Sequence, residues 1–276
     1  MTEVKIIYMK RFLTFIFLAA FSVTSFAQNA DEIINKFIEA AGGKGKLNAV
    51  NTLQYTQLTK FKSAMGDLEI PMKYFKEKGK LFRVETALQF GPQAMNFLTV
   101  VNDTAGYVVV PSNPMFGTEG GLQRMSAKDH ALQVANMDAS GLFSSLIDYA
   151  AKGHKVELMK EEKVNKEDCY KIKHSLADGQ EVMYFISKTS NLIIRADAKG
   201  AMASNMTGMG SLMSTMGGGG RMEKMEVSSL YSDYKDFDGI KFPVKLLIKS
   251  PMGDLQSEIS NIQINKPINS ALYKAQ

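Results

Sequence analysis

Residues 68–88 read LEIPMKYFKEKGKLFRVETAL, and apolar and polar side chains alternate on both sides of a central turn. Glu69 and Lys73 interrupt the first apolar series, Arg83 and Glu85 interrupt the second, and the turn falls at Lys76–Gly79. This period of two is typical of strands that bury one face. The stretch therefore predicts an antiparallel hairpin with one apolar face, made of Leu68, Ile70, Met72, Tyr74, Phe82, Val84, Thr86 and Leu88.

The same pattern recurs along most of the chain in short runs separated by turn residues. Before the hairpin, residues 31–41 have helical spacing and end at Gly42-Gly43, and two mid-chain segments, Ser126–Met137 and Gly141–Lys152, also carry helical patterns. The sequence predicts an α+β fold, mostly antiparallel β. We expect a curved half-barrel sheet of about 10–11 strands with helices on its apolar concave face.

The N-terminus has the three parts of a secretory signal peptide in order. Lys10 and Arg11 precede an apolar run over 12–21, and Ser25-Phe26-Ala27 supplies small residues at the peptidase positions. The run is about half of the roughly 20 residues that span a bilayer, which favours cleavage after Ala27 over a membrane anchor. We expect a mature chain, 28–276, that forms one domain in the periplasm and has no membrane span.

The composition excludes several classes of function. The formal charge of +5 falls to about +3 without the signal peptide, and Lys and Glu are interspersed, so nothing indicates a nucleic-acid partner. The single Cys169 forms no internal disulfide and is typical of a buried small apolar residue. No HExxH, GxSxG or P-loop signature is present, and His130, His154 and His174 lack metal-ligand spacing. The sequence predicts no catalytic residue, no metal and no cofactor, although a hydrolase without a recognised signature is an alternative.

The layout and two stretches resemble a known family. After the export signal comes a short helix, Asp31-Glu32-Ile33-Ile34 to Gly42-Gly43. The long series of hairpins that follows closes on Tyr234–Pro243, YKDFDGIKFP. With the export signal and the central helical insertion, the chain resembles the LolA/LolB-like group, in particular the outer membrane lipoprotein-sorting proteins of Bacteroidetes-type bacteria. The resemblance implies a half-barrel carrier for lipoprotein acyl chains or another lipid. It also implies two partners, an inner-membrane release complex and an outer-membrane acceptor.

An apolar concave face that helices fill only in part is a site for a hydrophobic ligand. The residues that we expect to line it are Ile70, Met72, Tyr74, Phe82, Val84, Phe97, Tyr184, Ile186, Phe242, Val244 and Leu246. The alternative is that these side chains pack against the helices and leave no cavity, as in an envelope structural or interaction protein.

A methionine-rich stretch lies within residues 199–222. Five methionines are spaced four and three apart, which places them on one stripe of a helix, but the interspersed glycines weaken any helix there. Three interpretations remain open: a lid or plug over apolar ligands, Cu(I) binding, or a flexible insertion without a role. The residues are Met202, Met206, Met209, Met213 and Met216.

Overall fold

The computed structural model describes residues 30–63, 66–90, 93–112, 119–207, 225–251 and 253–275. The expected signal peptide and the methionines at 209, 213 and 216 lie outside these residues. Within the described part of the chain, no helix is both long enough and apolar enough to span a membrane.

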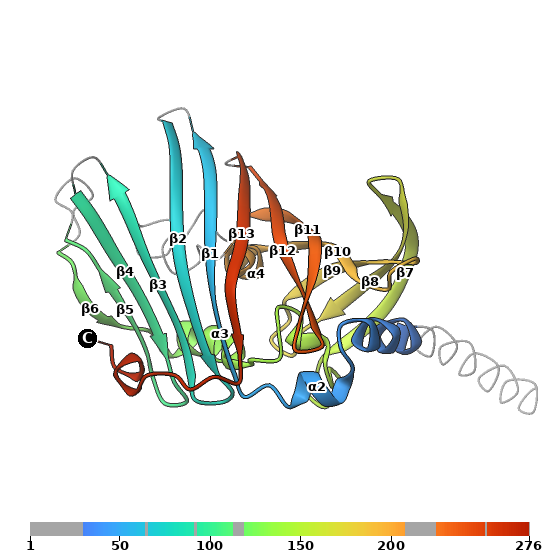
Figure 1. Cartoon of the computed structure of the whole chain (residues 1–276), viewed down its shortest axis with the longest axis horizontal. Coiled ribbons are helices and arrows are strands. Elements are labelled where there is room, and N and C mark those ends of the chain that lie inside the picture. Colours follow the sequence, from blue (N-terminus) through green and yellow to red (C-terminus); the bar gives the residue numbers. More distant parts are fainter. Residues whose placement is uncertain are drawn as a thin grey trace, which may run out of the picture.

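Within the described residues, thirteen antiparallel strands form one curved, open sheet (Figure 1). The mostly antiparallel α+β half-barrel is confirmed, with more strands than the ten or eleven expected. One addition is β6, a four-residue strand whose side chains are all exposed and show no alternation. The strands are β1 Thr52–Ser63, β2 Gly66–Glu77, β3 Leu81–Phe90, β4 Gln93–Val101, β5 Gly106–Val110, β6 Gly121–Arg124, β7 Lys155–Val164, β8 Glu167–Ser175, β9 Glu181–Ser187, β10 Ile193–Lys199, β11 Glu226–Phe237, β12 Ile240–Ser250 and β13 Gly253–Ile264.

The strand order shows which strands are neighbours and which two form the edges of the open sheet. It runs β6-β5-β4-β3-β2-β1-β13-β12-β11-β10-β9-β8-β7, so β1 pairs with β13, and β6 and β7 are the two edges. Register keeps one face apolar: Tyr74 lies opposite Tyr55 on β1 and Val84 on β3. Because side chains alternate across a strand, this register places all three on the concave side.

The chain between β6 and β7 must travel from one edge of the sheet to the other, and we call residues 125–154 the connector. It contains α3 (Ala127–Val134) and two 3₁₀ turns, Ala135–Met137 and Ser144–Leu146. Ser126 caps α3 by accepting a hydrogen bond from the Asp129 amide at 3.1 Å. The connector buries Met137, Phe143 and Leu146 in the main core, and α3 lies inside the curve of the sheet (Figure 1).

The prediction of a helix over Gly141–Lys152 is wrong. Apart from the 3₁₀ turn, this segment is a series of turns, with positive φ at Gly141 (118°) and Asp148 (52°). Asp148 is held there by an ion pair with Lys44 at 2.5 Å and a hydrogen bond from Asn48 at 3.1 Å. These tertiary contacts with α2 (Lys44–Asn48) outweigh the helical spacing of the apolar residues.

The expected N-terminal helix is present over residues 30–40, and it buries Ile34 and Phe37. It ends at Gly42, whose φ is 134°. A Cβ there would lie 2.4 Å from the carbonyl oxygen of Gly239, in the turn between β11 and β12. Glycine therefore permits both the backbone turn and the close approach to this hairpin.

Phe143 fastens the connector to both the sheet and the N-terminal helix. Its ring makes edge contacts with Phe37, Tyr184 and Tyr231, at centroid distances of 5.7, 6.0 and 4.9 Å. We expect Phe143→Ala to lower the free energy of unfolding by about 3–5 kcal/mol, because it removes these contacts and leaves a void. Urea denaturation measures the change. Leu122→Ala, at a residue that is 55% exposed, is the control and should change stability by less than about 0.5 kcal/mol; equal effects would contradict the role given to Phe143.

Candidate functional site

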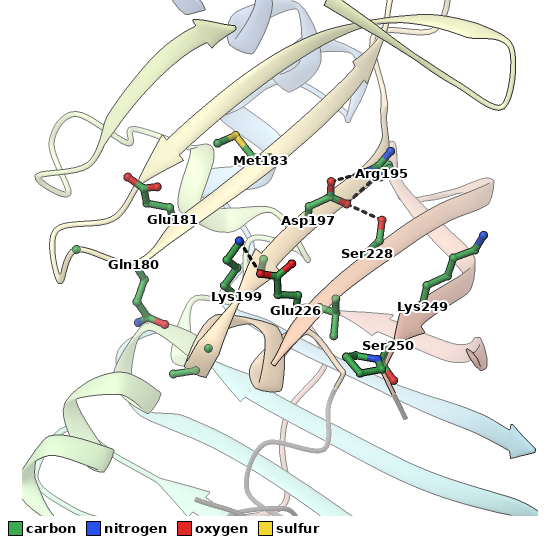
Figure 2. Close-up of a pocket in the computed structure, with 16 residues that line it drawn as sticks. Gln180, Glu181, Met183, Arg195, Asp197, Lys199, Glu226, Ser228, Lys249 and Ser250 are labelled. Carbon is green, nitrogen blue, oxygen red and sulfur yellow. Dashed lines mark hydrogen bonds and ion pairs between the residues drawn. The ribbon is translucent and has the colours of Figure 1, made fainter. Parts of the chain in front are cut away.

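One depression lies at the convex side of the sheet, where outward side chains of β9, β10 and β11 meet (Figure 2). Its volume is about 860 Å³ and it is open to solvent. Most of its charges are already paired: Arg195 binds Asp197 at 2.7 and 2.5 Å, and Lys199 binds Glu226 at 2.6 Å. Ser228 also donates to Asp197, at 2.5 Å. With these groups engaged with one another, the depression is a weak candidate for a ligand site.

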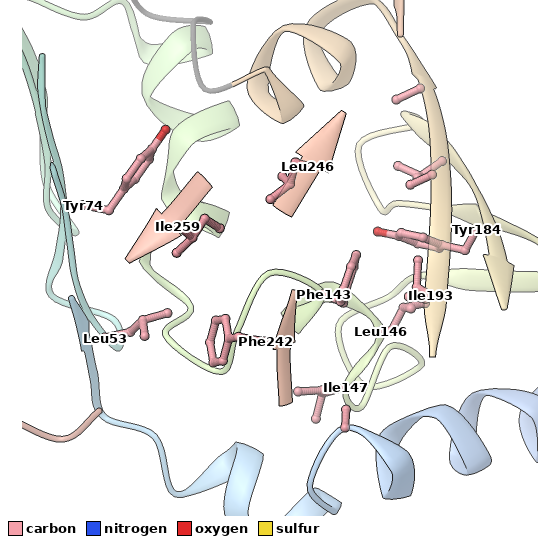
Figure 3. Packing of buried hydrophobic residues seen from close by; sticks show 14 of the residues in the cluster. Leu53, Tyr74, Phe143, Leu146, Ile147, Tyr184, Ile193, Phe242, Leu246 and Ile259 are labelled. Carbon is pink, nitrogen blue, oxygen red and sulfur yellow. The ribbon is translucent and has the colours of Figure 1, made fainter. Parts of the chain in front are cut away.

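The candidate site is a smaller cavity of about 210 Å³ on the concave side. The sheet forms one wall, and the connector and α4 (Gly200–Met206) form the other. Figure 3 shows Tyr74 and Tyr184 pointing inward from opposite arms of the sheet, with Phe143 and Leu246 between them. The cavity is thus enclosed by elements far apart in sequence.

Aromatic side chains give the cavity its apolar character. Tyr55 and Tyr74 stack with their ring centroids 4.5 Å apart and an interplanar angle of 12°. Across the cavity, Tyr184 and Tyr231 pack against the edge of Phe143. Burial raises the pKa of Tyr74, Tyr184 and Tyr231 above the usual phenol value, so these rings stay neutral.

The residues proposed from the sequence fall into three groups. Tyr74, Phe82, Val84, Tyr184 and Leu246 line the cavity. Ile70, Met72, Ile186 and Phe242 are buried in the packed core, Phe97 packs against that core half-buried, and Val244 is buried. Met202 and Met206 project from α4, pack against the core and line the cavity.

Several polar residues that the sequence did not single out also line the cavity. A chain of hydrogen bonds links three of them: Asn136 donates to Gln133 at 2.7 Å, and Gln133 donates to Asn205 of α4 at 3.2 Å. Lys76 lines the opposite wall, on the sheet. Its signal in the sequence is its spacing, because it continues the series Ile70, Met72 and Tyr74 on the apolar face of β2.

A pair of histidines, His154 half-buried and His174 buried, lies near the cavity, where the connector enters β7. His154 Nδ1 is 3.2 Å from His174 Nε2 and 3.3 Å from the Ser145 carbonyl oxygen. His174 is fully buried, and its Nδ1 has no hydrogen-bond partner among the described residues. Burial, aided by His154 and Lys152, lowers the pKa of His174 to about 4. His174 is therefore neutral at physiological pH.

Catalytic and metal chemistry find little support in the described residues. No cluster of three or more His, Cys, Asp and Glu side chains occurs there that could hold a metal ion. Cys169 is buried in a small convex-side cluster with Val164 and Phe185, and burial raises the pKa of its thiol. A protonated, buried thiol is a poor nucleophile.

Solved structures with the same fold support the LolA-like architecture. A DUF1329 family protein from Desulfovibrio piger matches with a TM-score of 0.55 at 12% identity, over 89% of this chain and 97% of that one. A LolA superfamily protein from Nitrosomonas europaea matches with a TM-score of 0.54 at 12% identity, over 89% and 97%. A putative outer membrane lipoprotein-sorting protein domain from Vibrio parahaemolyticus matches with a TM-score of 0.53 at 11% identity, over 90% and 97%.

No protein-family model matches the sequence, and no curated protein is detectably similar to it. The fold is LolA-like, and identities this low establish the fold alone.

The histidine pair predicts a pH dependence of stability. Because the pKa of His174 is lowered to about 4 in the folded protein, unfolding takes up a proton between that value and about 6.5. Stability from this group is present above pH 6.5 and is lost as the pH falls toward 4, by up to roughly 3 kcal/mol. We expect His174→Phe to reduce the loss of thermal stability in this window, measured by melting temperature at pH 7, 6, 5 and 4. His130→Gln, at a histidine outside the pair, is the control; identical pH profiles for wild type and His174→Phe would contradict the assignment.

Proposed function

We propose that the chain is an exported periplasmic binding protein that carries a hydrophobic ligand, such as the acyl chains of a lipoprotein, in outer membrane lipoprotein sorting. The observation that carries this proposal is the cavity on the concave side, with aromatic and aliphatic walls and a cover of short, irregular segments. The N-terminal signal sequence supports export, and residues 28–276 would act as one domain.

The cover is the part of the cavity suited to move. Ligand pockets usually have volumes of roughly 300–1,000 Å³, whereas this cavity measures about 210 Å³. An acyl chain therefore requires α4 and the connector to shift outward, while the hydrogen-bonded sheet stays in place. α4 has seven residues and no side-chain cap at its N-terminus, and isolated helices of this length have little stability of their own. Met202 and Met206 would serve as an adaptable lid because unbranched thioether side chains fit irregular apolar partners.

Transfer of such a ligand between membranes requires partners that load and unload the carrier. We propose an inner-membrane release complex and an outer-membrane acceptor for these roles. This part of the proposal is supported by the LolA-like fold and by the similar structure from Vibrio parahaemolyticus, which is described as a lipoprotein-sorting protein domain.

Expression of the whole chain, with its own N-terminal segment, tests both export and binding. Native mass spectrometry of the protein from the periplasmic fraction should show a chain beginning at Gln28 with lipid bound, and the purified protein should bind a fluorescent acyl probe. A chain of apo mass that binds no probe would instead identify a packed envelope protein without a ligand.

Filling the cavity should weaken binding. Leu246 lines the cavity, whereas Leu247, the next residue on β12, projects from the other face of the sheet. We expect Leu246→Trp to reduce affinity for the acyl probe at least about tenfold, or ~1.4 kcal/mol, because the indole occupies ligand space. Leu247→Trp adds the same ring outside the cavity and should leave affinity within about twofold. Fluorescence titration measures both, and equal affinities would show that the probe binds elsewhere.

A further inference from the structure

The concave cavity is lined by a positive charge that has no counter-ion among the described residues. Lys76 is only 8% exposed, and on the sheet it lies directly opposite Leu53 of β1 and Phe82 of β3. Its Nζ lies 5.6 Å from the centre of the Phe82 ring. Among the described residues, no carboxylate lies within ion-pair distance of this ammonium, and none of their hydrogen bonds involves it.

One acidic side chain, Asp138, attracts the charge of Lys76, but its carboxylate already binds other groups. Asp138 of the connector binds Lys152 at 2.8 Å and accepts a hydrogen bond from the Ser140 amide at 3.0 Å. Its attraction for Lys76 is weaker than the effect of burial, which lowers the pKa of Lys76 to about 8. Lys76 therefore remains mostly protonated at neutral pH, in surroundings that stabilise its charge poorly.

An unpaired buried ammonium costs several kcal/mol of stability, and a bound anion at hydrogen-bond distance would offset much of this cost. The polar groups on the facing wall, Gln133 and Asn136, supply further hydrogen-bonding atoms beside the same space. Apolar walls next to a single buried cation match a ligand with an alkyl chain and an acidic head.

We propose that the ligand of this cavity is an anionic amphiphile whose acidic headgroup, a carboxylate or a phosphate, binds the ammonium of Lys76. This inference rests on the proposed carrier function and specifies the chemistry of its ligand. The alkyl chain would lie between Tyr184, Leu246 and the α4 methionines, Met202 and Met206, which line the rest of the cavity.

The test compares ligands of equal chain length and different headgroups. Palmitic acid, hexadecyl phosphate and the neutral 1-hexadecanol compete against a fluorescent acyl probe, with wild type, Lys76→Met and Lys73→Met. Lys73 is exposed on the outer face of the same strand, so it is the matched control for loss of one positive charge. Methionine is similar to lysine in length and has an apolar stem, so Lys76→Met should fold. Because the substitution removes a buried charge, the melting temperature of Lys76→Met should be higher than that of wild type.

We expect wild type and Lys73→Met to bind at least one of the two anionic ligands at least about tenfold more tightly than the alcohol, the scale of a charge-assisted hydrogen bond. Lys76→Met should lose this preference and keep its affinity for the alcohol. The carboxylate and phosphate arms then decide which acid is the better ligand. The wild-type preference should also decline above pH 8, where free Lys76 loses its proton.

Four results would overturn the proposal. If wild type binds the alcohol and the acids equally, or if Lys76→Met keeps the preference, the headgroup assignment fails while the carrier function stands. If no amphiphile displaces a probe that does bind, the headgroup assignment fails; if the probe itself does not bind, the carrier function fails together with it.

Discussion

The connection between β6 and β7 is the constraint on which the rest of the structure depends. Every other pair of consecutive strands lies side by side in the sheet, but these two form its opposite edges. Residues 125–154 must therefore cross the open side of the half-barrel. In doing so they cover an apolar face that would otherwise be exposed to water, at roughly 25 cal/mol for each Å² covered. The site is a consequence of this path, because the cavity is the space that the connector leaves unfilled.

The two walls of the cavity differ in rigidity. Each strand of the sheet wall is held by a ladder of backbone hydrogen bonds on both sides, whereas the connector and α4 are short elements joined by side-chain contacts. Phe143 fixes the connector near the N-terminal helix, and the hydrogen bond from Gln133 to Asn205 joins it to α4. Sub-global opening draws on the least stable segments of a fold. This division supports a carrier whose framework persists while its cover moves.

The sequence was sufficient for the fold class because the period of two persists through most strands and the register follows from it. The sequence was insufficient where contacts between distant residues determine the local conformation. The spacing of Leu142, Leu146 and Ile147 predicted a helix, but the contacts of Asp148 with Lys44 and Asn48 stabilise turns instead. The pairing of His154 with His174 depends on the register of β7 with β8, which a lone histidine does not reveal. Lys76 was missed because the turn was predicted at Lys76–Gly79, whereas β2 continues to Glu77 and the turn begins at Lys78. A charged residue beside a glycine is typical of a turn, and only its spacing from Tyr74 places it on the apolar face.

Lys76 gives the inner face of this half-barrel a chemical feature beyond its apolar shape. The similar solved structures are 11–12% identical to this chain, so the same architecture forms from very different sequences. The apolar concave face by itself favours an apolar ligand. Any further selectivity between ligands must come from the few polar groups that face inward. A neutral side chain in place of Lys76 would satisfy the packing without the cost of a buried charge. Because an ammonium occupies that position, the inner face is better matched to an acid attached to an alkyl chain than to an alkyl chain alone.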